Sequence, residues 1–334
     1  MSFSVAPFLT LCLCLAASVG ANAAASPGAS SNKLEPLIVS DTGLFAFNAD
    51  TLTLRWQQLF DQQTLNPIID GERVYVTGSR GLYAIDVGSG DVIWHYSSAR
   101  GGFPPVLHNQ QIYFANRDGV LQVFNASDGA LLWERRFPGW IYPPAFYGDL
   151  LFTGGSEGFL WGVDLRNGAI RWTYSVGQEL VYSPVALVNG QIVATTFNRE
   201  VFSIDPHGEL IWKHTYEAIL SDPLASGELL IFTGLDHRLY ALDAEDGGKR
   251  WQRQLPERQA TRLSQRHGSI LVSMETGRIW EIDALSGELQ QEYQLPGEPV
   301  ASPQRFGNQI LGFVRTFDGP KAVFLRPLDP SKLF

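Results

Sequence analysis

The chain has 334 residues, and its 34 Asp and Glu residues outnumber its 25 Lys and Arg residues, for a formal net charge of −9. This acidic balance argues against nucleic acid or an anionic membrane surface as the main partner. By length alone the chain accommodates two ordinary domains, but an internal repeat takes precedence over that estimate.

The first 23 residues predict a secretory signal peptide. They contain no Lys, Arg, Asp or Glu, and an apolar stretch from Phe8 to Ala17 is followed by the small-residue triplet Ala21-Asn22-Ala23. This stretch is too short to remain as a transmembrane helix, although the positive charge that usually precedes it is missing. We expect cleavage after Ala23 or a residue or two later, export of the chain, and a mature protein without a transmembrane span.

Both cysteines of the chain, Cys12 and Cys14, lie inside the predicted signal peptide. A lipoprotein signal has a small residue immediately before its cysteine, whereas a leucine precedes each of these two. The sequence therefore predicts no lipid anchor. Without cysteine in the mature chain, disulfides, thiolate nucleophiles and cysteine-ligated metal ions are excluded.

One pattern recurs from the first unit to the last. Each copy has an apolar strand, an Asp or Asn, a short polar turn, and a strand that in six of the copies contains Trp. The Asp and Asn anchors are 38 to 41 residues apart, and they are Asn48, Asp86, Asn125, Asp164, Asp205, Asp243 and Asp283. A period near 40 residues with several short strands per unit is typical of β-propeller blades.

One copy divides into four strands, A to D, at residues 105–107, 111–115, 120–124 and 131–135, with turn-forming residues between them. The first unit has a polar strand A at residues 28–32, and the last unit, residues 302–328, ends after strand C. We therefore predict a single all-β propeller domain over residues 24–334. Eight blades with a seam between the chain ends are favoured, and seven blades are the alternative.

The repeated polar and aromatic residues are predicted to be structural. The Asp or Asn side chain accepts amide hydrogens of the turn, and Gly supplies a positive φ angle there. The Trp on strand D is expected to pack flat against the neighbouring blade. The residues assigned to structure in this way are Asp86, Trp94, Asn125, Trp133, Asp164, Trp172, Asp205, Trp212, Asp243 and Trp251.

The segment from Leu82 to Trp94, LYAIDVGSGDVIW, resembles the PQQ-type repeat, and related copies cover the mature chain. PQQ-type repeats also occur in quinoprotein dehydrogenases, so the resemblance keeps a PQQ- and Ca²⁺-dependent dehydrogenase as an alternative. The six histidines have no metal-ligand spacing, and the Asp residues are spread one per blade instead of converging. The sequence thus predicts no catalytic, cofactor or metal site.

Among PQQ-repeat propellers without enzyme features, the chain resembles the BamB family of outer-membrane protein assembly factors. The likeness lies in length, export, the missing cysteine pairs and the end after a third strand. It implies a periplasmic scaffold, peripheral to the outer membrane, that binds proteins of β-barrel assembly. That family normally carries a lipobox, which this chain lacks. A secreted propeller that binds or senses a small ligand, in a mouth lined by Tyr142 and Tyr182, is the third alternative.

In a propeller the D–A and B–C connections emerge on one face, and here they carry aromatic residues and arginines. Such residues, exposed together, are the usual composition of binding hot spots. The predicted partner-binding residues are Arg100, Phe103, Trp140, Tyr142, Tyr182, Arg117, Arg199 and Arg238. The structural alternative is that the aromatic side chains plug the channel or cover strand ends. We expect the mature chain to be a monomer with a protein partner.

Overall fold

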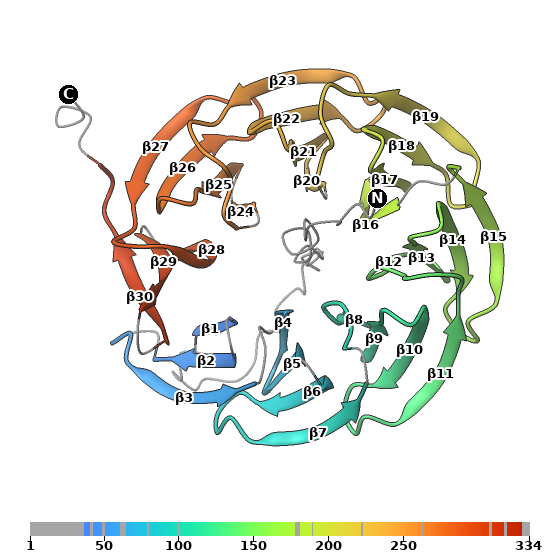
Figure 1. Ribbon diagram of the computed structural model, residues 1–334, viewed down its shortest axis with the longest axis horizontal. Coiled ribbons are helices and arrows are strands. Elements are labelled where there is room, and N and C mark those ends of the chain that lie inside the picture. Colours follow the sequence, from blue (N-terminus) through green and yellow to red (C-terminus); the bar gives the residue numbers. More distant parts are fainter. Residues whose placement is uncertain are drawn as a thin grey trace, which may run out of the picture.

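A computed structural model of the chain describes residues 37–328 except 41–42, 49–50, 61–64, 79, 99–100, 178–180, 189, 222, 262, 267, 307–308 and 317–318. The predicted signal peptide and the strand expected at 28–32 lie outside these residues. The described chain is an all-β propeller of mainly four-stranded antiparallel blades. The sheets stand side by side around a ring, each running from the centre to the rim (Figure 1).

We number the sheets in chain order. Sheet 1 contains β1 (Leu37–Ser40), β2 (Gly43–Phe47) and β3 (Leu54–Leu59). Sheet 2 contains β4 (Leu65–Asp70), β5 (Arg73–Gly78), β6 (Gly81–Asp86) and β7 (Val92–Ser97). Sheet 3 contains β8 (Val106–His108), β9 (Gln111–Ala115), β10 (Val120–Asn125) and β11 (Leu131–Arg136). Sheet 4 contains β12 (Ala145–Tyr147), β13 (Leu150–Gly154), β14 (Phe159–Asp164) and β15 (Ile170–Ser175).

The second half of the ring repeats this order. Sheet 5 contains β16 (Val181–Val188), β17 (Gln191–Thr196), β18 (Glu200–Ile204) and β19 (Leu210–Thr215). Sheet 6 contains β20 (Leu224–Ser226), β21 (Leu229–Thr233), β22 (Arg238–Asp243) and β23 (Lys249–Gln254). Sheet 7 contains β24 (Ser264–Arg266), β25 (Ser269–Ser273), β26 (Arg278–Asp283) and β27 (Leu289–Gln294). Sheet 8 contains β28 (Pro299–Phe306), β29 (Gln309–Thr316) and β30 (Gly319–Leu325).

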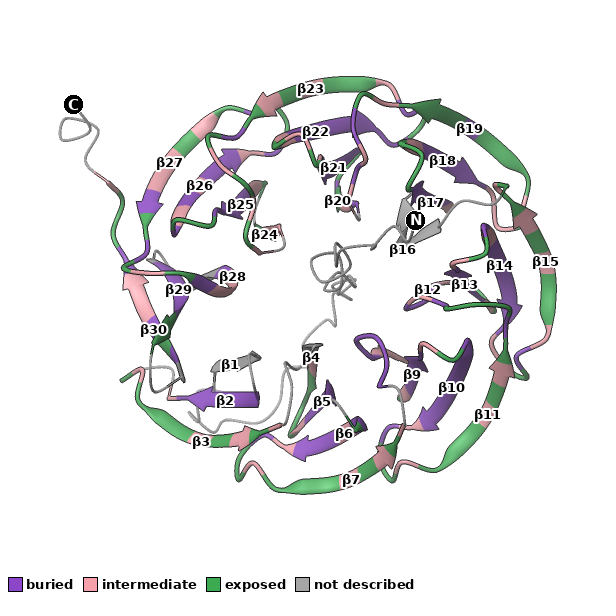
Figure 2. Ribbon diagram, in the orientation of Figure 1, coloured by how far each residue is buried: buried purple, intermediate pink, exposed green. Residues whose placement is uncertain are grey.

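The four strands predicted for one copy are β8 to β11, each within one residue of its expected bounds. The second and third strands of the four-stranded sheets are almost wholly buried, because each sheet is covered by a neighbour on both faces (Figure 2). The outermost strand instead alternates between exposed and half-buried residues, as in β7 and β11. The core is therefore a series of apolar layers between neighbouring sheets.

The blade count depends on the two sheets formed by the ends of the described chain. Six sheets have four strands, whereas sheets 1 and 8 have three each and are separate in their hydrogen bonding. Phe45 and Phe47 of β2 pack in one cluster with Leu311 and Phe313 of β29, so these two sheets face each other. Counted together as the one unit that closes the ring, they give seven blades. The eight blades favoured from the sequence were therefore wrong, because neither end sheet has a fourth strand within the described residues.

Tryptophan joins each of sheets 1 to 6 to the next sheet. The indole Nε1 of Trp94 donates a hydrogen bond to the carbonyl oxygen of Ala126 at 3.1 Å, and that of Trp133 donates to Leu165 at 3.1 Å. The acceptor is in each case the residue after the Asp or Asn anchor of the next sheet. Four further joints have the same form, from Trp56, Trp172, Trp212 and Trp251.

The turn glycine lies under the indole ring of the preceding sheet. A Cβ atom on Gly129 would lie 2.7 Å from Cδ2 of Trp94, and φ is +71° there, so both space and backbone require glycine. In sheet 1 this turn position is Leu52, with a φ of +55°. The Leu52 side chain packs against the cluster shared by sheets 1 and 8. Leu52 thus occupies the position at which the other C–D turns contact a tryptophan ring.

The joint between sheets 7 and 8 has glutamine in place of tryptophan. Nε2 of Gln291 donates to the carbonyl oxygen of Leu328 at 3.3 Å, and the amide of Leu328 donates to the carbonyl oxygen of Glu292 at 2.8 Å. The residues that follow β30 thus lie beside β27. Their carbonyl oxygen accepts the hydrogen bond that a C–D turn carbonyl accepts in the other joints. Beside Gln291, buried Glu281 accepts a hydrogen bond from the Tyr293 hydroxyl at 2.8 Å.

Two of the anchor aspartates are neutralised by arginines of their own sheet. Arg166 and Arg171 donate to the Asp164 carboxylate, which is fully buried, and these hydrogen bonds hold the pKa of Asp164 well below its usual range. Arg250 lowers the pKa of Asp243 in the same way. The anchor carboxylates are therefore committed to the fold.

Candidate partner-binding face

The D–A and B–C connections of each sheet meet on one face of the ring, which we call the loop face. Isolated β-bridges tie the two kinds of connection together, for example Gly102 to Asn116 and Ile141 to Gly155. Equivalent bridges join Leu220 to Gly234 and Gln259 to Met274. The D–A connections are thus held by backbone hydrogen bonds, and their side chains are presented from a fixed frame.

Two predicted partner-binding residues are not described as side chains. Arg100 lies outside the described residues, and only the backbone of Tyr182 is described, within β16. Phe103 is described but is only 6% exposed, in the core cluster between sheets 3 and 4. Its expected exposure was wrong, because neighbouring side chains close over its ring.

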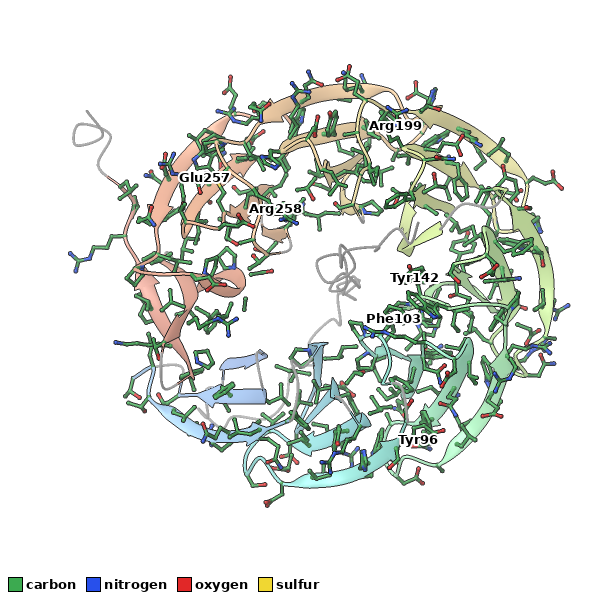
Figure 3. The ribbon with its side chains drawn as sticks, in the orientation of Figure 1. Tyr96, Phe103, Tyr142, Arg199, Glu257 and Arg258 are labelled. Atoms are coloured by element: carbon green, nitrogen blue, oxygen red, sulfur yellow. The ribbon has the colours of Figure 1, made fainter. Side chains whose placement is uncertain are left out.

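The side chains that cover Phe103 are Tyr142 and Arg117. The Tyr142 ring lies 5.0 Å from the Phe103 ring between centroids, and the two appear side by side in Figure 3. The Arg117 guanidinium carbon lies over the Phe103 ring, 5.9 Å from its centroid. Tyr142 is half-buried and its carbonyl oxygen accepts a hydrogen bond from Thr153 Oγ1 at 2.6 Å. Phe103 and Tyr142 therefore support the loop face more than they extend from it.

Three large apolar side chains do extend from the loop face. Trp140, which the sequence predicted, is 37% exposed, and its amide is held by Ser156 Oγ at 2.9 Å. Phe197 is 45% exposed and Leu235 is 59% exposed. The sequence analysis did not predict these two, because it expected apolar residues on the D–A connections and arginines on the B–C connections. The signal was present in the sequence, because both lie in B–C turns, where sheets 2, 3 and 4 have only polar residues or glycine.

The arginines of the loop face divide into two groups. Arg238 is paired with Asp236 at 3.1 Å and Glu217 at 3.8 Å. Three more arginines in sheets 7 and 8, or in the connections leading to them, are paired as well: Arg258 with Glu275, Arg278 with Glu257 and Glu292, and Arg315 with Glu298. This part of the face, near Glu257 and Arg258 in Figure 3, is therefore electrically balanced.

Arg117 and Arg199 form the second group, and neither is paired with a carboxylate of the described residues. Nε of Arg117 is buried without a hydrogen-bond acceptor. Arg199 is exposed at the tip of a B–C turn, with a φ of +65° that turns the chain sharply. With Trp140, Phe197 and Leu235 they form what we call the binding arc, which spans sheets 3 to 6.

The opposite face carries acidic turns and one open depression of about 290 Å³. It is lined by Asp70, Glu72, Arg73, Asp86 and Ile93. Ser89 donates hydrogen bonds to Asp86 and lowers the pKa of its carboxyl. In the described ranges no three His, Cys, Asp or Glu side chains are grouped to hold a metal ion. Nor does a helix long and apolar enough to cross a membrane occur in that part of the chain.

Comparisons with known proteins agree with this architecture. The family described as outer membrane protein assembly factor BamB matches residues 24–135, 82–214 and 178–314. The crystal structure of BamB from Moraxella catarrhalis superposes with a TM-score of 0.71 at 16% identity, covering 87% of this chain and 94% of that one. The computationally designed Ika8 protein superposes with a TM-score of 0.71 at 14% identity, covering 89% and 94%. No curated protein matches by sequence. The family match covers most of the chain, so this chain belongs to the BamB-like family of PQQ-repeat propellers.

Proposed function

We propose that the mature chain is a non-catalytic periplasmic scaffold, a single propeller domain of residues 24–334 that holds a protein of outer-membrane β-barrel assembly on its loop face. Family membership supports the class of partner, since the family is described as an outer membrane protein assembly factor. Export rests on the signal peptide predicted at residues 1–23. The role needs no cofactor, and the proposed docking surface is the binding arc.

The observation that carries this proposal is the composition of the binding arc. Trp140 and Phe197 are aromatic, exposed and anchored on loops with hydrogen-bonded backbones. Aromatic and arginine side chains contribute most of the free energy at protein interfaces. Arg117 and Arg199 lack the carboxylates that neutralise the arginines of sheets 6 to 8. A partner surface with apolar pockets and carboxylates is therefore the best complement to this arc.

The test is a binding measurement with tagged mature chain and detergent-solubilised barrel-assembly proteins. The double variant Trp140→Ala/Phe197→Ala should lose at least about 30-fold in affinity, because two central anchors are removed. Tyr147→Ala/Leu285→Ala is the matched control, since these apolar residues are 45% and 74% exposed in A–B and C–D turns on the opposite face. Equal affinity of the two double variants for the partner would show that the partner does not bind the loop face. No capture by the unaltered chain would reject the role itself.

A further inference from the structure

The outer edge of β30 differs from every other rim position of the ring. In six sheets the third strand is covered by a fourth, whereas sheet 8 ends at β30 within the described residues. β30 lies at the rim between β27 and β3 (Figure 1). All seven of its residues are paired with β29 on the inner side. No strand of the described residues pairs with its outer side, and such a strand edge is a template for one more strand.

The charges around this edge are basic, although the whole chain has a net charge of −9. Lys321, within β30, and Arg326, directly after it, are exposed, and Arg55 is exposed on β3 of the neighbouring sheet. In the described part of the chain none of the three has an ion-pair partner. Arg171 and Arg250 occupy the position of Arg55 in sheets 4 and 6, where aspartate anchors neutralise them. Sheet 1 has Asn48 at that anchor, so Arg55 keeps an uncompensated charge.

The turn of sheet 1 limits what can pair with β30. In sheets 1 to 6, the tryptophan of strand D lies over the turn glycine of the next sheet. Here Leu52 fills that place. A strand added to β30 therefore has no room for a large side chain above this turn, and the repeat's own Trp-containing strand does not fit.

We propose that the edge of β30 binds an extended, acidic segment of a partner polypeptide, which adds to sheet 8 as its fourth strand. Main-chain hydrogen bonds hold the segment to β30, and its carboxylates lie against Lys321, Arg326 and Arg55. This site is on the rim and is separate from the binding arc. It therefore does not depend on the loop face having a partner.

The probe for the test is a fluorescent ten-residue peptide of alternating valine and glutamate, added to the full mature chain. We expect saturable binding by fluorescence anisotropy and slower amide hydrogen exchange in residues 319–325. An N-methylated version of the same peptide cannot donate main-chain hydrogen bonds and should not bind. Binding of both peptides, or protection at the rims of other sheets instead, would overturn the proposal.

Charge reversal separates the edge from general attraction to the protein. Lys321→Glu/Arg326→Glu should weaken peptide binding about tenfold, because two favourable contacts become repulsive. Lys213→Glu/Lys249→Glu makes the same change in charge on the rims of sheets 5 and 6 and should leave binding unchanged. If the first variant does not fold, Arg55→Glu gives the comparison without altering β30. If Pro320 and Lys321 only guard the edge against aggregation, the peptide fails to bind and the proposal is rejected.

Discussion

Each tryptophan joint combines a hydrogen bond with flat ring packing, so one residue acts on two sheets. The indole donates to a turn carbonyl, and the ring covers the turn glycine of the same sheet. The carbonyl would otherwise lack a protein partner, and the glycine surface would be exposed. Because the sheets share only side-chain contacts here, these residues determine how firmly neighbouring blades are held together.

Replacing Trp133 should show both parts of the joint. Trp133→Ala removes the ring and the hydrogen bond and should lower the free energy of unfolding by about 3 kcal/mol. Trp133→Phe keeps most of the ring and should cost about 1 kcal/mol through the lost hydrogen bond to Leu165. Urea denaturation followed by tryptophan fluorescence and circular dichroism measures both. Equal losses for the two variants would assign the whole effect to the hydrogen bond.

The buried carboxylate of Asp164 should make stability depend on pH in the acidic range. Because its pKa is lowered in the folded chain, its contribution is present above the unfolded pKa of about 3.9 and is lost as pH falls toward the folded value. Asp164→Asn should be less stable than the unaltered chain at pH 7, and the difference in the free energy of unfolding should shrink steadily as the pH falls below about 4. Asp205→Asn is the control, since Asp205 makes the turn hydrogen bonds without an arginine. Urea denaturation midpoints at several pH values test this prediction. A difference in midpoint between Asp164→Asn and the unaltered chain that stays the same at every pH would contradict it.

Repetition made the structural residues predictable, whereas the exposure of single aromatics was not. Trp133 recurs at a fixed offset, so its role follows from the pattern alone. Phe103 and Trp140 look alike in sequence, yet one is buried and the other exposed. The difference comes from Tyr142 and Arg117, which cover Phe103 from another sheet and another loop. Such contacts join residues distant in sequence, and no local pattern records them.

At the scale of elements, the turn between strands C and D determines how closely two sheets approach. Its glycine has a positive φ and contacts the neighbouring indole, so the turn and the joint are one unit. Strand positions followed from the spacing of such turns and were accurate within one residue in sheet 3. Ring closure did not follow, because sheets 1 and 8 meet through contacts between the two ends of the chain.

Two glycine substitutions separate backbone strain from crowding. Gly148 and Gly129 both have positive φ angles, but a Cβ on Gly148 meets nothing within 4 Å, whereas one on Gly129 meets Trp94. Gly148→Ala should cost about 1 kcal/mol from backbone strain. Gly129→Ala should cost about 2 kcal/mol more, because the indole must move. Chemical denaturation of both variants measures the difference. Equal losses in the free energy of unfolding would mean that the indole ring moves aside without an energetic cost.

For the molecule as a whole, the loop face is divided by its ion pairs. Sheets 6 to 8 satisfy their arginines internally, while the binding arc leaves Arg117 and Arg199 without carboxylates in the described chain. A paired arginine must break its internal ion pair before it contacts a partner, and that cost offsets the free energy gained from the new contact. An arginine without a carboxylate partner has no such cost. The sequence predicted arginines on this face, but it did not show which of them were already neutralised.

This division predicts different effects of two arginine substitutions on partner binding. Arg199→Ala should weaken binding about tenfold and reduce its dependence on salt, because an interfacial charge is removed. Arg258→Ala, in the ion-paired part of the face, should change affinity less than twofold. Titrations at two salt concentrations compare them. A larger effect of Arg258→Ala would place the partner on sheets 7 and 8.

Leu52 has a further consequence for assembly. Six joints between sheets have the same pairing of tryptophan and glycine. In principle, the last sheet of one molecule could therefore pack on the first sheet of another molecule in the same way. Repeat proteins avoid such chain-to-chain extension by altering their terminal units. With leucine in the turn, the first blade has no room for a foreign indole, and Gln291 leaves sheet 7 without one to offer. We therefore expect the seam to act as a pair of end caps that disfavours blade stacking between two molecules.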